Sequence, residues 1–261
     1  MLASTVPTCQ AYDPAFAYEM ATIINAGTQR MYGGPAPEGA FGDETGENVF
    51  YYLTLYNENY VMPARPDHVT DDDIMSGLYR WAPAPEGDHR HKSTILFSGS
   101  AQGAARQAQT DLLEHYGVAA ELWSATSYKR LREDALSDER RNRLHPNQPP
   151  VVAPVTEKLA HSAGPIVAVT DFMKSVPEQI SRFVPFTDNG RPRTFTALGT
   201  DGFGRSDTRE ALRRFFEVDA AHVVVATLSS LHADGEIDAS VVEDAIARYD
   251  IDRDSADPRT R

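Results

Sequence analysis

A chain of 261 residues, 41% of them hydrophobic and 24% charged, can bury a sizeable core, and its composition excludes an intrinsically disordered protein. The net charge of −13 argues against general nucleic-acid binding, and no apolar run reaches the roughly 20 residues that span a bilayer, so neither nucleic acid nor membrane is an expected partner. Cys9 is the single cysteine and no secretory signal opens the sequence, so we expect a cytoplasmic protein.

The N-terminal part of the chain predicts one helix and one strand. Residues 13–33 carry apolar side chains near the helical period, with Asp13 as a plausible N-cap and Pro14 at the first helical position. Residues 48–56, NVFYYLTLY, are dense in aromatic and β-branched side chains and predict a strand buried on both faces. One helix and one strand cannot enclose a core, so this part has the character of the end of a domain whose remainder is missing.

Two stretches rich in proline or glycine separate these elements from the rest of the chain. Residues 33–47 predict a loop, and residues 62–92, with mixed charge and several prolines, predict a linker or an excursion. The second stretch contains aspartates 71–73, and His89 and His91 follow them. Because a metal needs ligands that converge on a rigid frame, an exposed polar linker is favoured there over a metal site.

From Ser93 onward, strands and helices alternate. Strands are predicted at 93–100, 118–125, 164–172 and 194–200, and helices at 101–117, 127–144, 175–184, 208–218, 219–235 and 238–251. Alternation of this kind implies crossover connections, and therefore an α/β fold with a mainly parallel sheet and helices on both faces.

The first strand-to-helix turn contains Gly99, Ser100 and Gly103. In a doubly wound fold such a turn can offer backbone N–H groups and a helix N-terminus to an anion. The full spacing G-x-G-x-x-G and a P-loop lysine are both absent from the sequence, so a tight structural turn is favoured over a nucleotide site.

A second glycine-rich loop, 199–207, connects the last predicted strand to the next helix. Its glycines permit positive φ angles, and Ser206 or Asp207 can cap that helix. Asp201 and Arg205 have no such structural role, and they could form an ion pair or contact a neighbouring domain. We therefore interpret the loop as a strand-to-helix connection in which Asp201 and Arg205 form a candidate interface.

Three long sequence segments resemble a known family: CQAYDPAFAYE at 9–19, FYYLTLYNENYVMP at 50–63, and LGTDGFGRSDTREALRRFFEVDAAHVVVATL at 198–228. They resemble the C-terminal end of the homodimeric bacterial pyruvate dehydrogenase decarboxylating components, which are transketolase-like enzymes dependent on thiamine diphosphate. The resemblance implies that residues 1–61 end a pyrimidine-binding domain. It also implies that the remainder is the entire transketolase C-terminal-like domain. We therefore assign this domain to 93–261, with 62–92 as a linker or excursion.

The resemblance also implies an activity. Members of this family oxidatively decarboxylate pyruvate and reductively acetylate the lipoyl group of the dihydrolipoyl acetyltransferase, using thiamine diphosphate and magnesium in a homodimer. Their magnesium and diphosphate are held by a Gly-Asp-Gly turn and a later asparagine. The dipeptide at Asp201 has no asparagine after it, and residues 42–44 lack the second glycine.

We therefore expect no catalytic, cofactor-binding or metal-binding residue in this segment, and no activity from it alone. The expected role is structural and dimer-supporting, and the alternative is an autonomous module that docks the acetyltransferase. An unpartnered apolar strand at 48–56 favours association of the whole segment. A chain starting near Ser93 is therefore expected to be better behaved, that is, more soluble and less associated.

Overall fold

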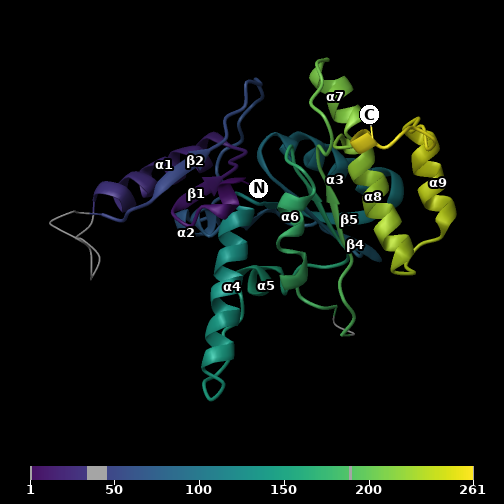
Figure 1. Cartoon of the computed structure of the whole chain (residues 1–261). Helices are drawn as coiled ribbons and strands as arrows, with labels where there is room; N and C mark the ends of the chain where they lie inside the picture. Colours follow the sequence, from purple (N-terminus) through teal and green to yellow (C-terminus); the bar gives the residue numbers. More distant parts are fainter. Residues whose placement is uncertain (1, 34–45, 188–189, 261) are drawn as a thin grey trace.

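The main sheet lies at the centre of the molecule (Figure 1). The structure, a computed structural model, describes residues 2–33, 46–187 and 190–260, and within them this sheet has five strands in the order β3-β5-β4-β6-β7. The strands are β3 (Tyr79–Ala82), β4 (His91–Phe97), β5 (Val118–Ser124), β6 (Ile166–Val169) and β7 (Phe195–Leu198). All neighbours pair in parallel except β3, which is antiparallel to β5. The predicted α/β fold class is confirmed.

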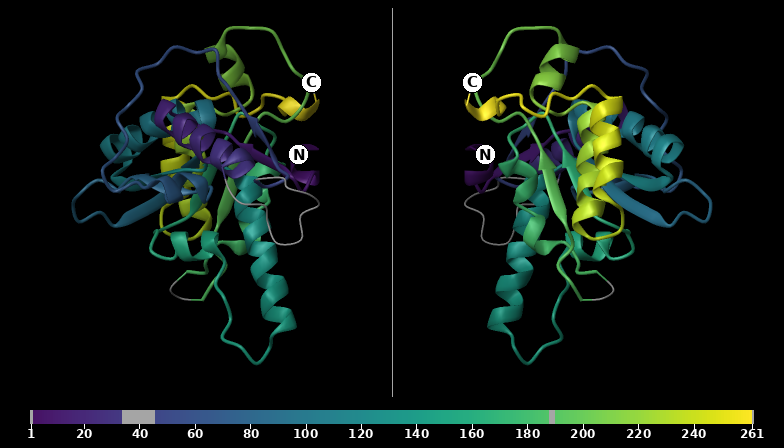
Figure 2. Two further views of the ribbon diagram at one scale, coloured as in Figure 1. Left: turned by 90° about the vertical axis from the view of Figure 1, so that its left-hand side faces the viewer. Right: turned by 90° about the vertical axis from the view of Figure 1, so that its right-hand side faces the viewer.

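Helices cover both faces of the main sheet (Figures 1 and 2). One face carries α3 (Gln102–Tyr116), α8 (Ala220–Ala233) and α9 (Ala239–Arg248), and the other carries α4 (Tyr128–Leu144), α5 (Pro154–Leu159) and α6 (Ser175–Glu178). Side chains of β4 alternate between the two layers: Ile95 and Phe97 join the first core and Leu96 joins the second. The apolar runs seen in the sequence follow from this two-sided burial.

Most predicted helices are confirmed, with local differences at their ends. Gly117 ends α3 in the left-handed conformation at a φ of 64°, as a C-terminal glycine does. The last short helix before the C-terminal pair, α7 (Arg209–Phe215), is capped by Thr208 rather than by Ser206 or Asp207. The helix predicted at 175–184 is only the four residues of α6, followed by a separate 3₁₀ turn that places Phe183 in the core.

The N-terminal part differs from the prediction in two ways. Helix α1 (Ala17–Tyr32) begins after Phe16, so Asp13 is not its N-cap. Strand β2 (Phe50–Leu53) is not buried on both faces, since Phe50 is 49% exposed. The reason is that β2 pairs with β1 (Cys9–Tyr12), an unpredicted strand, and among the described residues this strand pair has no further neighbour.

The stretch 62–92 is more than a linker. It contains α2 (Asp71–Met75), capped by the hydroxyl of Thr70, and then the edge strand β3. The limits at 61 and 93 stay a prediction, but the main sheet already begins at Tyr79. Most of the predicted loop at 33–47 lies outside the described residues. Within the part of the chain that the structure describes, no helix is both long and apolar enough to cross a membrane.

The strand pair and α1 pack directly against the main sheet. The Phe16 ring stacks on Trp81 at 5.5 Å between centroids and meets the edge of Phe97 at 5.9 Å. The Lys129 ammonium donates to the carbonyl of Cys9 at 2.6 Å. Because the two parts share one core, a chain starting near Ser93 would expose apolar surface that Phe16 and Trp81 now cover. The expectation that such a chain is better behaved stays a prediction, and this shared core counts against it.

Replacing Phe16 with alanine tests this shared core. The Phe16 side chain is only 2% exposed, and loss of a buried aromatic ring costs about 3–5 kcal/mol of unfolding free energy. We expect urea denaturation, followed by circular dichroism, to show a loss of that size in Phe16→Ala. Tyr32→Ala, at a side chain 72% exposed, serves as the control and should change stability by less than about 0.5 kcal/mol. Equal losses in both variants would contradict the shared core.

Candidate functional site

The main sheet reverses its winding direction between β4 and β6. From β4 the chain moves to β5 on one side, and it then returns past β4 to β6 on the other. The carboxyl ends of these two strands are joined by the hydroxyls of Ser98 and Thr170, which lie 2.8 Å apart. Ligands of doubly wound sheets bind in the crevice beyond such a switch point. A ligand-binding site is therefore expected at this edge of the sheet.

A crevice of about 380 Å³ opens at this edge. Its walls come from residues 56–58 of the N-terminal part, from Ser100 and Asp171 at the ends of β4 and β6, and from residues between 200 and 218. The Gly99 turn and the glycine-rich loop, which the sequence presented as separate candidates, therefore line the same space. Four segments that are distant in the sequence meet there.

The Gly99 turn is tight, as predicted. Gly99 has a φ of 50°, and a side chain there would collide with the hydroxyl of Tyr56 and the carboxyl of Asp13. The hydroxyl of Ser100 donates to the carboxylate of Asp171, which links the ends of β4 and β6 a second time. The turn thus brings the N-terminal part of the chain close to the switch point.

Asp201 and Arg205 do not form a pair with each other in the described structure. The carboxylate of Asp201 accepts from the backbone N–H of Lys174 at 3.1 Å, so it has a structural role that the sequence did not reveal. The guanidinium of Arg205 lies 4.1 Å from the centre of the Phe215 ring and lines the crevice. Their role as an interface between domains stays a prediction.

Helix α7 presents two further arginines to the crevice. Arg213 donates to both carboxylate oxygens of Glu58, at 3.1 and 2.5 Å, and Arg209 donates to the carbonyl of Asn57. These hydrogen bonds lower the pKa of Glu58 and raise that of Arg213, because each charge stabilises the other. The pair fastens residues 56–58 to α7 and closes one side of the crevice.

Asp13 is a buried acid beside the crevice. The hydroxyls of Thr54 and Tyr56 donate to its Oδ1 atom, whereas its Oδ2 atom has no partner among the described residues. Burial raises the pKa of this carboxyl, and the nearby charge of Asp171 raises it further. Hydrogen bonds from hydroxyl groups oppose this rise. Asp13 therefore holds its proton to a higher pH than an exposed aspartate does.

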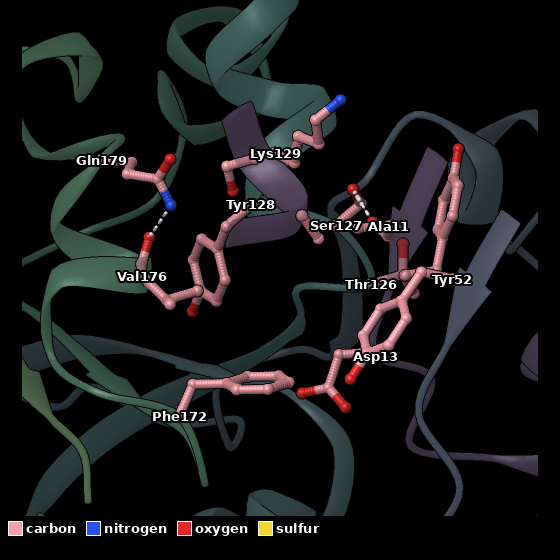
Figure 3. Close-up of a pocket in the computed structure, with 13 residues that line it drawn as sticks. Ala11, Asp13, Tyr52, Thr126, Ser127, Tyr128, Lys129, Phe172, Val176 and Gln179 are labelled. Atoms are coloured by element: carbon pink, nitrogen blue, oxygen red, sulfur yellow. Dashed lines mark hydrogen bonds between the residues drawn. The ribbon is translucent and has the colours of Figure 1, made fainter. Parts of the chain in front are cut away.

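Asp13 also lines a second, smaller cavity of about 70 Å³ (Figure 3). Tyr128 and Phe172 line the same cavity, and the Tyr128 hydroxyl likewise lacks a partner within the described part of the chain. A water molecule occupies about 30 Å³ of liquid, so the cavity has room for one or two waters.

Glu19, at the start of α1, is the second buried acid. Within the described structure its carboxylate accepts from the backbone N–H groups of Ala15 and Phe16, at 2.5 and 3.0 Å. Its other oxygen accepts from the hydroxyls of Tyr79 and Ser124, each at 2.6 Å. Burial raises the pKa of Glu19, and these four hydrogen bonds oppose the rise.

Among the described residues, no group of three or more His, Cys, Asp or Glu side chains could hold a metal by itself. His91 instead contacts Glu236 at 3.2 Å, and His89 lies beside the carbonyl of Glu86 at 3.2 Å. Residues 42–44 lie outside the described residues. We therefore assign no step to the cofactor in this segment.

The fold and the crevice define the class of protein: a doubly wound α/β fold whose main sheet is packed against a small parallel strand pair and helix α1. Residues 77–219, more than half of the chain, match the model of the transketolase-like C-terminal domain. The chain therefore belongs to this transketolase-like family. Residues 1–63 match the middle domain of the pyruvate dehydrogenase E1 component. Both matches confirm the resemblance seen in the sequence.

Similar curated proteins are pyruvate dehydrogenase E1 components. The relative from Mycolicibacterium smegmatis is 48% identical over 257 residues, which are 98% of this chain and 26% of the relative. The relative from Escherichia coli K12 is 44% identical over 255 residues, which are 98% of this chain and 26% of the relative. The chain thus spans about a quarter of the length of these relatives.

Solved structures confirm the fold. A split-gene transketolase, described as an inactive β4 tetramer, has a TM-score of 0.53 at 18% identity, over 88% of this chain and 60% of that one. Transketolase from Leishmania mexicana has a TM-score of 0.53 at 15% identity, over 89% of this chain and 26% of that one.

The burial of Asp13 and Glu19 was not predicted from the sequence. Glu19 lies three residues after Phe16 and four before Ile23, so it falls on the apolar stripe of its own helix. A carboxyl at such a position needs a buried partner, which is a signal the pattern does contain. Asp13 gave no comparable signal, because its partners Thr54 and Tyr56 lie more than forty residues away.

Replacing Glu19 with glutamine tests the buried acid. Its raised pKa means that the folded state binds the proton more tightly than the unfolded state, so the contribution of Glu19 to stability falls as pH rises above about 4.3. Glutamine does not titrate, so the stability of Glu19→Gln relative to wild type should increase with pH in urea denaturation. The exposed change Glu243→Gln should show no such trend. A pH-independent difference for Glu19→Gln would contradict the assignment.

Proposed function

We propose that this chain is the C-terminal part of a pyruvate dehydrogenase decarboxylating component. In the complete protein the reaction would be oxidative decarboxylation of pyruvate with thiamine diphosphate and magnesium, followed by reductive acetylation of a lipoyl group. The partners would be a second copy of the protein and the dihydrolipoyl acetyltransferase. The names of the relatives and the middle-domain match at 1–63 support this proposal.

Within that protein, we infer a structural and dimer-supporting role for this segment. Residues 1–61 would end the pyrimidine-binding domain, 62–92 would connect it, and 93–261 would form the C-terminal domain. The buried carboxyls of Asp13 and Glu19 would fix the orientation of the first part on the main sheet. No residue of the segment is assigned to catalysis.

One observation carries the proposal: the strand pair is an incomplete sheet. Parallel sheets need cover on both faces, and two strands alone are marginal in water. Yet Phe50 and Tyr52 are 49% and 50% exposed, and Leu55 just beyond them is 80% exposed. Further strands of the same domain, supplied by the longer protein, would cover this surface.

Reconstitution in two pieces tests the proposal. A second polypeptide would carry the part of the Mycolicibacterium smegmatis relative that precedes the matched region. We expect neither piece alone to release carbon dioxide from pyruvate in the presence of thiamine diphosphate and magnesium, and the mixture to do so. Release by this chain alone would refute the structural role, and an inactive mixture of two folded pieces would count against the proposal.

A charge on the strand pair should block this reconstitution. Phe50→Lys places an ammonium group where a neighbouring strand would pack, whereas Phe186→Lys changes a side chain that is 65% exposed outside the strand pair. We expect activity of the mixture to fall at least about tenfold with Phe50→Lys, equivalent to about 1.4 kcal/mol, and to persist with Phe186→Lys. Circular dichroism would confirm that both variants fold. Equal activity of the two variants would exclude β2 as the contact.

A further inference from the structure

We propose that the crevice at the carboxyl ends of β4 and β6 binds the phosphate group of a small phosphate ester, held by Arg205 and Arg209. This site is separate from the structural role proposed above. The charges, the backbone and the walls of the crevice support the proposed site.

The crevice is locally positive in a chain whose net charge is −13. Arg205, Arg209 and Arg213 line it, against the carboxylates of Glu58 and Asp171. Glu58 forms an ion pair with Arg213. Among the described residues, no carboxylate forms an ion pair with Arg205 or Arg209. Two guanidinium groups that form no ion pair among the described residues match the two negative charges of a phosphate monoester.

The backbone around these arginines leaves room for a ligand. Gly204 lines the crevice, and no atom lies within 4 Å of the position that a side chain there would take. Ser100 lies in the turn that opens α3, a 15-residue helix with no acidic residue in its first turn and no side chain capping its N-terminus. The positive end of this helix adds to the attraction of the arginines for an anion.

The rest of the crevice suits the organic part of an ester rather than a free ion. Its wall includes the apolar side chains of Leu212, Phe216 and Val218. Asp171 and Thr200 also line it and can bond to hydroxyl groups of a ligand. The volume of about 380 Å³ lies within the range of small-molecule sites.

Calorimetric titration of the whole 261-residue chain tests the proposal. The probes are glycerol phosphate and adenosine monophosphate, with glycerol, adenosine and acetate as controls. We expect saturable binding of at least one phosphate ester and none of the controls, with an affinity that falls as salt rises. Absence of saturable binding up to about 10 mM of both esters would overturn the proposal.

Substitutions assign the binding to the crevice. Arg205→Gln is the cleanest change, because Arg205 contacts only the Phe215 ring within the described structure, and it should weaken binding about tenfold. Arg209→Gln should weaken it similarly, although it also removes the bond to Asn57. Arg253→Gln, an exposed arginine elsewhere on the chain, is the matched control. Unchanged affinity in Arg205→Gln and Arg209→Gln would overturn the proposal.

A chemical readout separates binding from folding. Phenylglyoxal modifies accessible arginines, and peptide mass spectrometry measures the extent at each one. A bound ester should slow modification of Arg205 and leave that of Arg253 unchanged. Equal protection of both arginines would mean that the ester binds without reaching the crevice, which would refute the assignment.

Discussion

The carboxyl group of Glu19 is the contact on which the arrangement of this chain depends. It has no exposed surface, and among the described residues it takes donors from the start of α1 and from strands β3 and β5. Burying an acid costs free energy unless each of its oxygens forms hydrogen bonds. This set of hydrogen bonds therefore stabilises one orientation of α1 on the sheet relative to others. Strand β1 precedes α1 and β2 follows it, so the strand pair is fixed together with α1.

The crevice depends on the same contact. Its outer wall, residues 56–58, belongs to the N-terminal part, whereas its base is the switch point of the main sheet. Asp13 bridges the two, because Tyr56 donates to its side chain and Gly99 donates to its backbone carbonyl. A shift of α1 on the sheet would therefore change the crevice as well.

Local patterns were sufficient to predict most of the helices and strands after Ser93, including the end of α3 at Gly117, because burial on both faces produces continuous apolar runs. They missed α5 and made the helix at 175–184 too long. They were insufficient for features set by distant partners. The exposure of β2 depends on which strands are present beside it, and the pairing of Glu19 with Ser124 spans 105 residues. The crevice likewise required four segments to meet, which no single window of sequence contains.

The stacking of Trp81 on Phe16 has a practical consequence. The chain has two tryptophans, and Trp81 lies where the N-terminal part meets the sheet, with the guanidinium of Arg106 at 5.4 Å from its ring. Trp123 lies in the core on the opposite face. In a Trp123→Phe background, intrinsic fluorescence would report separation of the N-terminal part from the sheet, and comparison with far-ultraviolet dichroism would distinguish that event from loss of helices.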